Sequence, residues 1–423
     1  MVSNNRIIAD PNCDDDYDDA SLTTDAALGR MLSSVSTVFG NETVAVLDSL
    51  GRILASPIVS SIDVPSHRNS AMDGYAVRTQ DLPEGDTRDL LVVGTAFAGK
   101  PYKGVVAENQ AVRIMTGAVV PESTNVVIMQ EQVERDGDKI TIDDRHKDGQ
   151  NVRAAGEDIQ RGTTVLPAGR VVAPADLGLI ASLGIGQVEV HRRTRVAFLS
   201  TGDELKAVGE TLGVGEIHDS NRYTLHGMLT RLGIEIIDLG VVRDKPNAVR
   251  EALTDAAARA DVIISSGGVS VGEADYIKEI LAEIGQVKFW KVAMKPGRPL
   301  AFGSIGESVF FGLPGNPVSV MVTFYQFVQP TLLKIMGAQE QAPVLVKAKA
   351  GNLLKKRPGR TEYQRGFLTT DADGGLVVTT ESDQGSGILS SMSNANCFVV
   401  LPLDSGRTEA GTFVDVQPFF GIM

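Results

Sequence analysis

Residues 261–275 read Asp261-Val-Ile-Ile-Ser-Ser-Gly-Gly-Val-Ser-Val-Gly-Glu-Ala-Asp275, and this stretch decides the fold. Its apolar start, Val262–Ile264, shows no polar alternation, which is typical of a strand buried on both faces. A glycine-rich loop follows, and the residues from Tyr276 onward are spaced as in an amphipathic helix. A buried strand, a loop and a helix in that order indicate the parallel sheet of an α/β domain.

The neighbouring sequence repeats this alternation on both sides. Further strands are predicted at 195–200, 235–242 and 310–314, and helices at 221–232, 246–260 and 317–335. Strands that alternate with helices of this length predict a central doubly wound, mostly parallel sheet that helices cover on both faces. We assign this α/β catalytic domain to residues 191–340.

The rest of the 423-residue chain is too long for one core, so we expect a multidomain α/β protein. Residues 1–19 are rich in aspartate and predict a disordered acidic tail. Residues 20–61 and 150–190 predict one discontinuous helical linker domain, with helices near Ala26–Val35, at Thr43–Leu54 and from Pro174. Short apolar runs between turn residues predict a small β-rich domain at 62–149 and an all-β domain at 341–423.

Composition excludes several classes of protein. The net charge of −13 argues against a nucleic-acid partner, because duplex binding needs a positive face. No apolar run is long enough to span a bilayer, and no apolar segment follows the first residues as in a secretory signal. Only Cys13 and Cys397 could form a disulfide, so we expect a cytoplasmic protein.

Ligands of open parallel sheets bind at the carboxyl ends of the strands, where four loops here carry chemistry. The loops are Ser200–Leu205, Val242–Pro246, Ser265–Asp275 and Lys291–Pro299, and the rigid turn Gly312–Ser319 follows them. Each also has a plain structural interpretation, as a capped turn, a helix N-cap, a glycine turn or a solvated strand edge. In so acidic a protein, cations beside glycine-rich loops favour the alternative, an anion site with carboxylates for Mg²⁺.

The residues alone therefore predict a phosphoryl or nucleotidyl substrate, and they do not reach a particular reaction. The two cysteines and five histidines show no metal-ligand spacing, so zinc and iron–sulfur sites are not expected. No arrangement typical of a serine hydrolase stands out either.

Eight separated motifs, taken together, resemble the molybdopterin molybdotransferase family, which includes MoeA and the E domain of gephyrin. The resemblance covers the chain from about Ala20 to Met423. The motifs are Ser70–Val77 (SAMDGYAV), Arg113–Ala118 (RIMTGA), Val152–Asp158 (VRAAGED), Ser200–Leu205 (STGDEL), Asp219–Arg222 (DSNR), Ser265–Asp275, Met294–Pro299 (MKPGRP) and Leu313–Ser319 (LPGNPVS).

The resemblance implies a transferase that inserts molybdenum from molybdate into adenylylated molybdopterin, with Mg²⁺-dependent release of AMP. It implies catalytic roles for Asp73, Thr116, Glu204, Asp244 and Asp275, the last three also as Mg²⁺ ligands. It implies that substrate or anion is bound by Ser266, Gly267, Gly268, Ser270, Lys291, Lys295, Arg298, Pro314, Pro317, Arg365 and Ser386. Because the dithiolene sulfurs that receive molybdenum belong to the substrate, no cysteine ligands are needed.

The family also implies a homodimer in which Asp73 and Thr116 reach the cleft of the partner subunit, and a contact with the molybdopterin adenylyltransferase. Two departures stand out: the acidic tail, and His218 where an aromatic residue is common. Two other functions stay open, the adenylyltransferase reaction and a non-catalytic scaffold like gephyrin. Tungstate is nearly isosteric with molybdate and stays open as a substrate.

Overall fold

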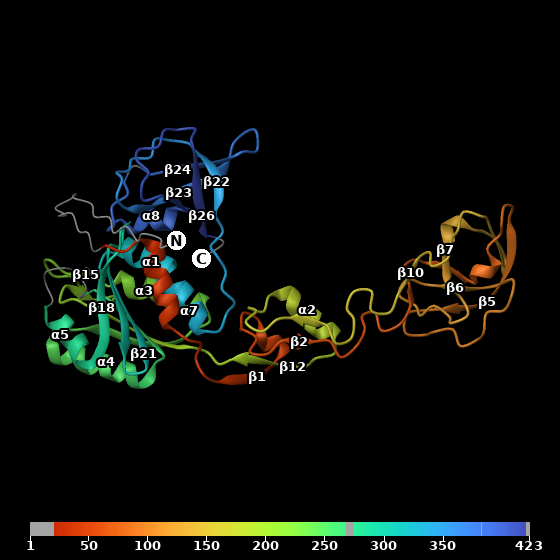
Figure 1. The fold of residues 1–423 in the computed structure, drawn as a ribbon, viewed down its shortest axis with the longest axis horizontal. Coiled ribbons are helices and arrows are strands. Elements are labelled where there is room, and N and C mark those ends of the chain that lie inside the picture. The colour runs from red at the N-terminus through yellow and green to blue at the C-terminus, as the bar shows by residue number, and fades with distance from the viewer. Residues whose placement is uncertain (1–20, 268–274, 382, 420–423) are drawn as a thin grey trace, which may run out of the picture.

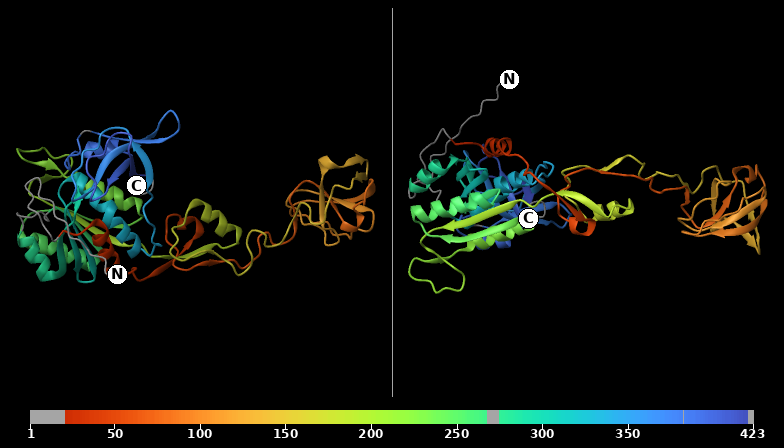
Figure 2. Two further views of the ribbon diagram at one scale, coloured as in Figure 1. Left: turned by 45° about the horizontal axis from the view of Figure 1, so that its top comes forward. Right: turned by 90° about the horizontal axis from the view of Figure 1, so that it is seen from below.

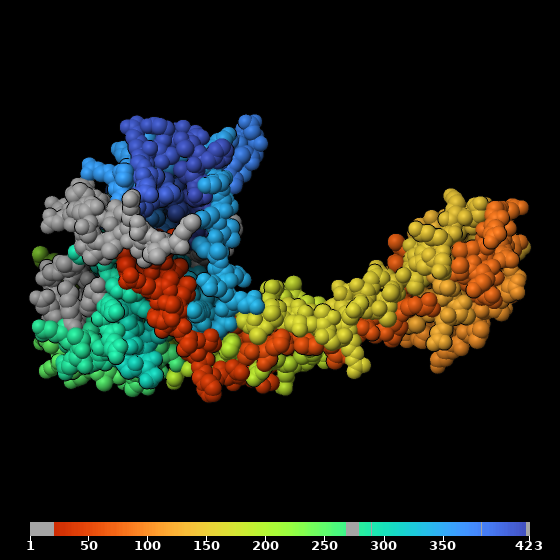
Figure 3. All heavy atoms as spheres, in the orientation of Figure 1, coloured from red at the N-terminus to blue at the C-terminus, as the bar shows by residue number. Residues whose placement is uncertain are grey.

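The computed structural model describes residues 21–267, 275–381 and 383–419. The molecule is elongated, with a broad body at one end and a narrow arm that carries a small β domain at its tip (Figure 1). The same shape is seen from two further directions in Figure 2 and as a solid surface in Figure 3. The expected acidic tail, residues 1–19, lies outside the described residues.

The body is built on a six-stranded sheet in the order β16-β13-β17-β21-β20-β18. The strands are β16 (Glu235–Val242), β13 (Arg195–Thr201), β17 (Val262–Ser266), β21 (Ser308–Leu313), β20 (Pro299–Ile305) and β18 (Gly285–Lys291). The first four run parallel, whereas β20 and β18 add an antiparallel edge. The predicted mostly parallel sheet is confirmed.

Helices cover both faces of this sheet, because alternate side chains of each strand point to opposite sides. Phe198 and Ile264 pack on the side of α3 (Ser220–Arg231). Ala197 and Ile263 pack on the side of α4 (Pro246–Arg259) and α5 (Asp275–Ile284). The doubly wound arrangement therefore follows from the apolar runs that predicted it.

The predicted helix at 317–335 forms with one irregularity. Helix α6 (Pro317–Thr323) continues through a π-helical turn, η4 (Phe324–Val328), into α7 (Gln329–Ile335). The N–H of Gln329 bonds to the carbonyl of Phe324, five residues back. Pro330 has no N–H to donate to the preceding turn, and the wider π turn accommodates it there.

The first predicted helix forms as α1 (Thr24–Ser34), capped by the Thr23 hydroxyl. We had grouped it with the linker, but its buried Ala27 and Met31 pack with the core around α7 in the body. A helix of 11 residues is only marginally stable in water by itself. Packing its apolar stripe on the large core of the body therefore stabilises α1.

The linker at the base of the arm contains less helix than we expected. Its elements are β1 (Asn41–Ala45) paired with β12 (Gln187–His191), β2 (Ile58–Val59) paired with β11 (Thr164–Leu166), the 3-10 turn η1 (Val46–Ser49) and α2 (Pro174–Ser182). The helix at Pro174 is confirmed, and the helix predicted over Thr43–Leu54 is wrong. β-Branched residues in this segment favour the antiparallel ladder with β12, and Gly51 turns the chain at φ +72°.

The tip of the arm is a six-stranded sheet in the order β7-β4-β6-β5-β9-β8, which confirms the small β-rich domain. Its strands are β4 (Gly74–Val77), β5 (Arg88–Ala96), β6 (Gln110–Ile114), β7 (Val126–Met129), β8 (Glu134–Asp136) and β9 (Lys139–Ile142). Two short strands, β3 (Asn69–Ser70) and β10 (Val152–Arg153), and two 3-10 turns, η2 (Thr79–Asp81) and η3 (Gln130–Gln132), border it.

The C-terminal domain is a closed barrel, as the prediction of an all-β domain requires. It contains β19 (Met294–Lys295), β22 (Val346–Ala350), β23 (Thr361–Thr370), β24 (Leu376–Thr380), β25 (Cys397–Leu401) and β26 (Phe413–Pro418), with α8 (Leu389–Asn394). Strand β23 pairs with both β24 and β25 and so closes the ring. Strand β19 comes from the body and joins the barrel to it. No helix of the described residues is long and apolar enough to cross a membrane.

Candidate active site

A cleft of about 920 Å³ lies at the carboxyl edge of the parallel sheet, where loops of the body meet a loop of the barrel. Half of the sixteen residues that the resemblance nominated line it, namely Glu204, Asp244, Ser266, Gly267, Lys295, Pro314, Pro317 and Ser386. Residues from six separate segments therefore meet at one place, as expected for the edge where parallel strands end.

The glycine-rich loop begins against the end of the neighbouring strand. Gly267 has φ +92°, and a Cβ added there would lie 2.6 Å from the carbonyl oxygen of Thr201. The Gly267 N–H donates to the carbonyl of Leu313 at 3.1 Å, which joins the ends of β17 and β21. Only glycine fits this close approach at this backbone angle. The Thr201 hydroxyl beside it is buried without a hydrogen-bond partner among the described residues.

Among the described residues three carboxylates line the cleft, and Asp219 is the one that the sequence analysis did not identify. It is 2% exposed and caps α3, since its Oδ1 accepts from the Arg222 N–H at 3.1 Å. Its Oδ2 is buried and has no hydrogen-bond partner in the described part of the chain. The other two are Glu204, which is exposed and folds over Gly202, and Asp244, which is half-buried. Asp219 is the first residue of the motif DSNR, and this motif was the sequence signal that could have identified it.

These oxygens fit Mg²⁺ by their chemistry. No group of three or more His, Cys, Asp or Glu side chains that could hold a metal occurs among the described residues. Mg²⁺ does not need such a cage, because it is commonly held by one or two carboxylates together with substrate phosphates and water. An unpartnered carboxylate oxygen beside Glu204 and Asp244 meets that need.

Of the four cations that the resemblance implied, only Lys295 lines the cleft. Its Nζ lies 3.8 Å from Oε1 of Glu362, and its side chain is 47% exposed. Lys291 and Arg298 are not among the residues that line the cleft. The cleft gains a cation that we did not nominate, Arg360, which follows the Pro358-Gly359 turn of the barrel. The Pro-Gly turn next to a charged residue was the sequence signal that could have identified Arg360.

Arg365 lies behind the cleft rather than in its lining. It is 1% exposed, and its guanidinium donates to the carbonyls of Gln384 at 3.0 Å and Gly385 at 2.9 Å. Its Nε donates to the Ser391 hydroxyl at 2.9 Å. Burial lowers the pKa of this guanidinium, and the carbonyls compensate for the lost water. Arg365 therefore shapes the loop that bears Ser386.

The Ser386 loop is also attached to the body. The carbonyl of Ser386 accepts from the N–H of Val318, in the first turn of α6, at 3.0 Å. This bond satisfies a donor that the start of a helix leaves free. It also brings the barrel against Pro314 and Pro317, so the cleft has one wall from each domain.

The start of α3 supplies a further polar wall that sequence reasoning missed. The amide of Asn221 donates to the Ser266 hydroxyl at 3.0 Å and to the Gly315 carbonyl at 2.7 Å. Both bonds use Nδ2, so the orientation of this amide is fixed. Asn221 thus links the glycine-rich loop to the Pro314–Pro317 turn.

Asp73 directly precedes β4 and Thr116 follows β6, so both belong to the β domain at the tip of the arm, which lies far from the body that holds the cleft (Figure 1). Both are exposed, and they contact each other: Oδ1 of Asp73 accepts from the Thr116 N–H at 2.7 Å and from its hydroxyl at 2.8 Å. These hydrogen bonds lower the pKa of Asp73. Gly74 allows the loop, because a Cβ there would lie 2.0 Å from the carbonyl oxygen of Ile128.

Three of the residues that the resemblance implied cannot be assigned to the cleft or to the tip of the arm. Gly268 and Ser270 lie outside the described residues, and so does the side chain of Asp275. The backbone of Asp275 begins α5, directly after the glycine-rich loop.

Comparisons with known proteins agree along the whole chain. Three family models match in order: the MoeA N-terminal region, domains I and II, at residues 22–184, a probable molybdopterin binding domain at 197–334, and the MoeA C-terminal region, domain IV, at 347–419. A molybdopterin molybdenumtransferase of Haemophilus influenzae is 46% identical, with 94% of this chain and 98% of that protein covered. One from Nostoc is 40% identical, with 85% of each covered.

Solved structures extend the likeness to the fold. The crystal structure of a molybdopterin biosynthesis MoeA protein from Pyrococcus horikoshii has a TM-score of 0.83 and 30% identity, covering 94% of this chain and 100% of that one. The match therefore includes the arm and its tip as well as the body. The chain belongs to the MoeA family.

Proposed function

We propose that this protein inserts molybdenum into molybdopterin. The substrates are adenylylated molybdopterin and molybdate, and AMP is released in a Mg²⁺-dependent step. The single observation that carries the proposal is the cleft at the carboxyl edge of the sheet, which is lined by the cations Lys295 and Arg360 and by the carboxylates Glu204 and Asp219. The name that its relatives carry, molybdopterin molybdenumtransferase, agrees with this chemistry.

The cations and backbone donors of the cleft suit both anionic substrates. Molybdate is a tetrahedral oxyanion, so a lysine, an arginine and N–H groups can bind it as they would bind phosphate. Lys295 attracts the negative charge, while Pro314 and Pro317 hold the wall of the cleft rigid beside it. Tungstate would be bound by the same groups.

Glu204, Asp244 and Asp275 are the proposed Mg²⁺ ligands, and the unpartnered Oδ2 of Asp219 makes it a fourth candidate. The metal would neutralise the charge of the pyrophosphate link and of the AMP leaving group. The protein residues orient the two substrates toward each other, which lowers the entropic cost of the transfer.

We propose a homodimer in which the Asp73–Thr116 pair of one chain completes the cleft of the other. This proposal is supported by the position of the pair, which is exposed at the end of the arm and cannot reach the cleft of its own chain without a large rearrangement. Two-fold dimers place equivalent surfaces opposite each other, so each arm would complete one cleft.

Two further proposals concern the cellular setting. The enzyme that adenylylates molybdopterin would deliver its product by contact with this protein. The reaction would take place in the cytoplasm, where a reducing environment suits the free, buried thiol of Cys397.

The proposal is tested by incubating the purified protein with adenylylated molybdopterin, Mg²⁺ and molybdate. We expect AMP release and activation of an apo-molybdoenzyme by the product. Both should be lost in Lys295→Ala and in Asp275→Ala. Consumption of ATP and free molybdopterin without AMP release from the adenylylated form would replace this proposal with the adenylyltransferase reaction.

A further inference from the structure

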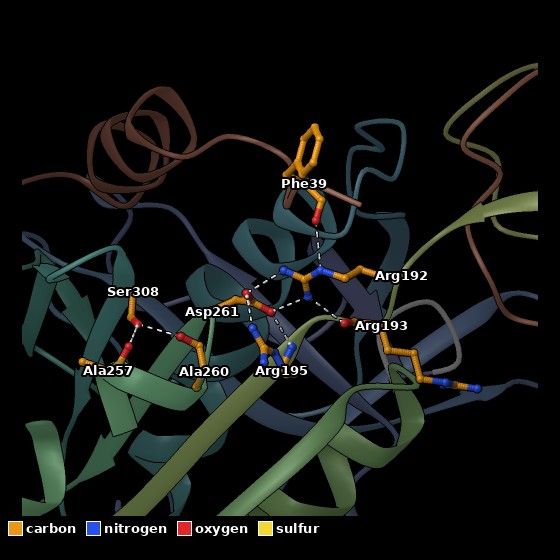
Figure 4. Close-up of polar contacts among 8 residues, drawn as sticks. All are labelled: Phe39, Arg192, Arg193, Arg195, Ala257, Ala260, Asp261 and Ser308. Carbon is orange, nitrogen blue, oxygen red and sulfur yellow. Dashed lines mark hydrogen bonds and ion pairs between the residues drawn. The ribbon is translucent and has the colours of Figure 1, made fainter. Parts of the chain in front are cut away.

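The arm leaves the body through two chain segments that cross at one place. Residues 39–40 lead out into β1, and residues 191–194 lead back from β12 into β13. Figure 4 shows the side chains at this crossing, where Arg192 lies between Phe39 and Asp261. Asp261 directly precedes β17, the strand that ends at the glycine-rich loop of the cleft.

Arg192 uses its whole guanidinium here. Nη1 and Nη2 donate to the two carboxylate oxygens of Asp261, each at 2.8 Å, and Nε donates to the carbonyl of Phe39 at 2.9 Å. Nη1 also donates to the carbonyl of Arg193 at 3.0 Å. The Arg192 backbone N–H bonds to the Gly40 carbonyl at 3.0 Å. One residue thus joins the outgoing segment, the returning segment and the sheet.

Both carboxylate oxygens of Asp261 accept hydrogen bonds at this place. Its Oδ2 accepts from the Arg195 N–H at 2.7 Å, and Nη2 of Arg195 lies 3.7 Å from its Oδ1. Burial alone would raise the pKa of this carboxyl, but the hydrogen bonds from Arg192 and Arg195 outweigh it and hold the pKa low. A bidentate, partly buried pair of this kind has defined geometry, unlike an exposed ion pair.

A second contact between arm and body is weaker. The Gln339 N–H donates to the Gly169 carbonyl at 2.9 Å, and its exposed side-chain amide donates to the Ala168 carbonyl at 3.0 Å. These are neutral hydrogen bonds with competition from water, worth less than the charged pair.

We propose that Arg192, held by Asp261, is a positioning residue that fixes the direction in which the arm leaves the body. Among the described residues, none of the hydrogen-bond partners of its side chain lines the cleft. Its effect on the reaction is transmitted through the arm, because the arm carries the Asp73–Thr116 pair. That effect on the reaction rests on the proposed shared active site. The contacts of Arg192 with Asp261 and Phe39, which we call the hinge, do not depend on it.

The hinge is tested by pulsed electron spin resonance on the full chain. Spin labels are placed at Leu47→Cys on the linker and Tyr223→Cys on α3, which are 84% and 56% exposed, in a Cys13→Ser background. Labelled protein is diluted with unlabelled protein, so that only distances within one chain are measured. The hinge variants are Arg192→Lys, which keeps the charge but loses the planar fork, and Asp261→Asn.

We expect a narrow distance distribution in the wild type and a clearly broader or shifted one in both hinge variants. The neighbouring Arg193→Lys is the matched control: Arg193 lies in the same returning segment, but its Nη1 donates to the Gly233 carbonyl rather than to Asp261 or Phe39, so its distance distribution should match the wild type. Gln339→Ala should broaden the distribution less than Arg192→Lys. A wild-type distribution in Arg192→Lys would overturn the proposal, and Asp261→Asn decides the matter if the first variant does not fold.

The enzymatic consequence is measured separately, by AMP release. In Arg192→Lys we expect kcat to fall about tenfold with KM changed less than about twofold, because substrate still binds the intact cleft. Broadened distances with unchanged kcat would leave the hinge standing and would argue against the shared site. Unchanged distances with reduced kcat would contradict the hinge itself.

Discussion

The cleft and the tip of the arm reach functional geometry in different ways. In the cleft, residues from six segments are held by hydrogen bonds from neighbouring side chains, such as the half-buried Asn221 on Ser266 and the buried Arg365 behind the Ser386 loop. At the tip, Asp73 and Thr116 lie on adjacent loops of one small sheet and are exposed. A buried, many-segment site can bind a ligand within one chain, whereas an exposed pair at the end of an arm needs a second surface to act on. This difference is the observation on which the proposed site shared by two chains rests.

The largest effect is expected at Lys295, one of the two cations that line the cleft among the described residues. Lys295→Ala should reduce kcat/KM for AMP release by about 10² or more, because it removes a cation from a site that binds two anions. Steady-state kinetics with varied molybdate will measure it. Lys347→Ala is the control, since Lys347 pairs with Asp415 on the barrel surface. Equal effects of the two variants would show that overall charge, and not the cleft, matters.

A smaller and pH-dependent effect is expected at the tip. Thr116→Val removes the hydroxyl bond to Asp73, so the pKa of Asp73 should rise toward its ordinary value. A carboxylate is charged above its pKa, so activity should be lost at higher pH than in the wild type as pH falls. At neutral pH we expect about a fivefold loss, the value of one hydrogen bond. The pH profile of kcat/KM will show both.

The small β domain at the tip of the arm offers a matched control for this prediction. Thr141 likewise donates its hydroxyl to an aspartate, Oδ1 of Asp89, at 2.7 Å on an exposed part of the same sheet, and Asp89 also pairs with Lys139. Thr141→Val should leave the pH profile unchanged. An acid limb that moves equally in both variants would contradict a specific role for Asp73.

A change behind the cleft should affect binding more than turnover. Arg365→Lys keeps the charge but cannot bond the carbonyls of Gln384 and Gly385 together, so the Ser386 loop should loosen. We expect KM for molybdate to rise by about fivefold with kcat nearly unchanged. Arg407→Lys, on the exposed Arg407–Glu409 pair, should have no effect. A fall in kcat alone would give Arg365 a different role.

The smallest effect is expected at His218. His218 lines the cleft but is exposed. It ends the short strand β15 (Ile217–His218), which pairs with β14 (Leu205–Lys206). Its Nδ1 lies 3.2 Å from the carbonyl oxygen of Ala207. His218→Tyr restores the residue class expected from the family. The change in kcat/KM should be less than about threefold, as for most exposed substitutions. A larger change would identify the rim of the cleft as a determinant of substrate choice.

The fold of the body was predictable, because the apolar runs of β13 and β17 specify burial on both faces of a parallel sheet. Strand β1 was not predictable, and a helix was predicted over Thr43–Leu54 instead, since the apolar spacing also suits a short ladder and the partner strand lies over 140 residues away. The glycine-rich loop and Lys295 were found from local patterns. Asp219 and Arg360 were missed because their roles depend on neighbours that only the folded chain supplies.

The shared site is tested most directly by one mixed dimer. Chains carrying Asp73→Ala and Lys295→Ala are co-expressed with different tags, and the heterodimer is isolated by both. Each chain alone should be inactive. In the heterodimer, the intact cleft of the first chain meets the intact tip of the second, so about half of the wild-type rate of AMP release should return. A heterodimer as inactive as either parent would contradict an active site formed by two chains.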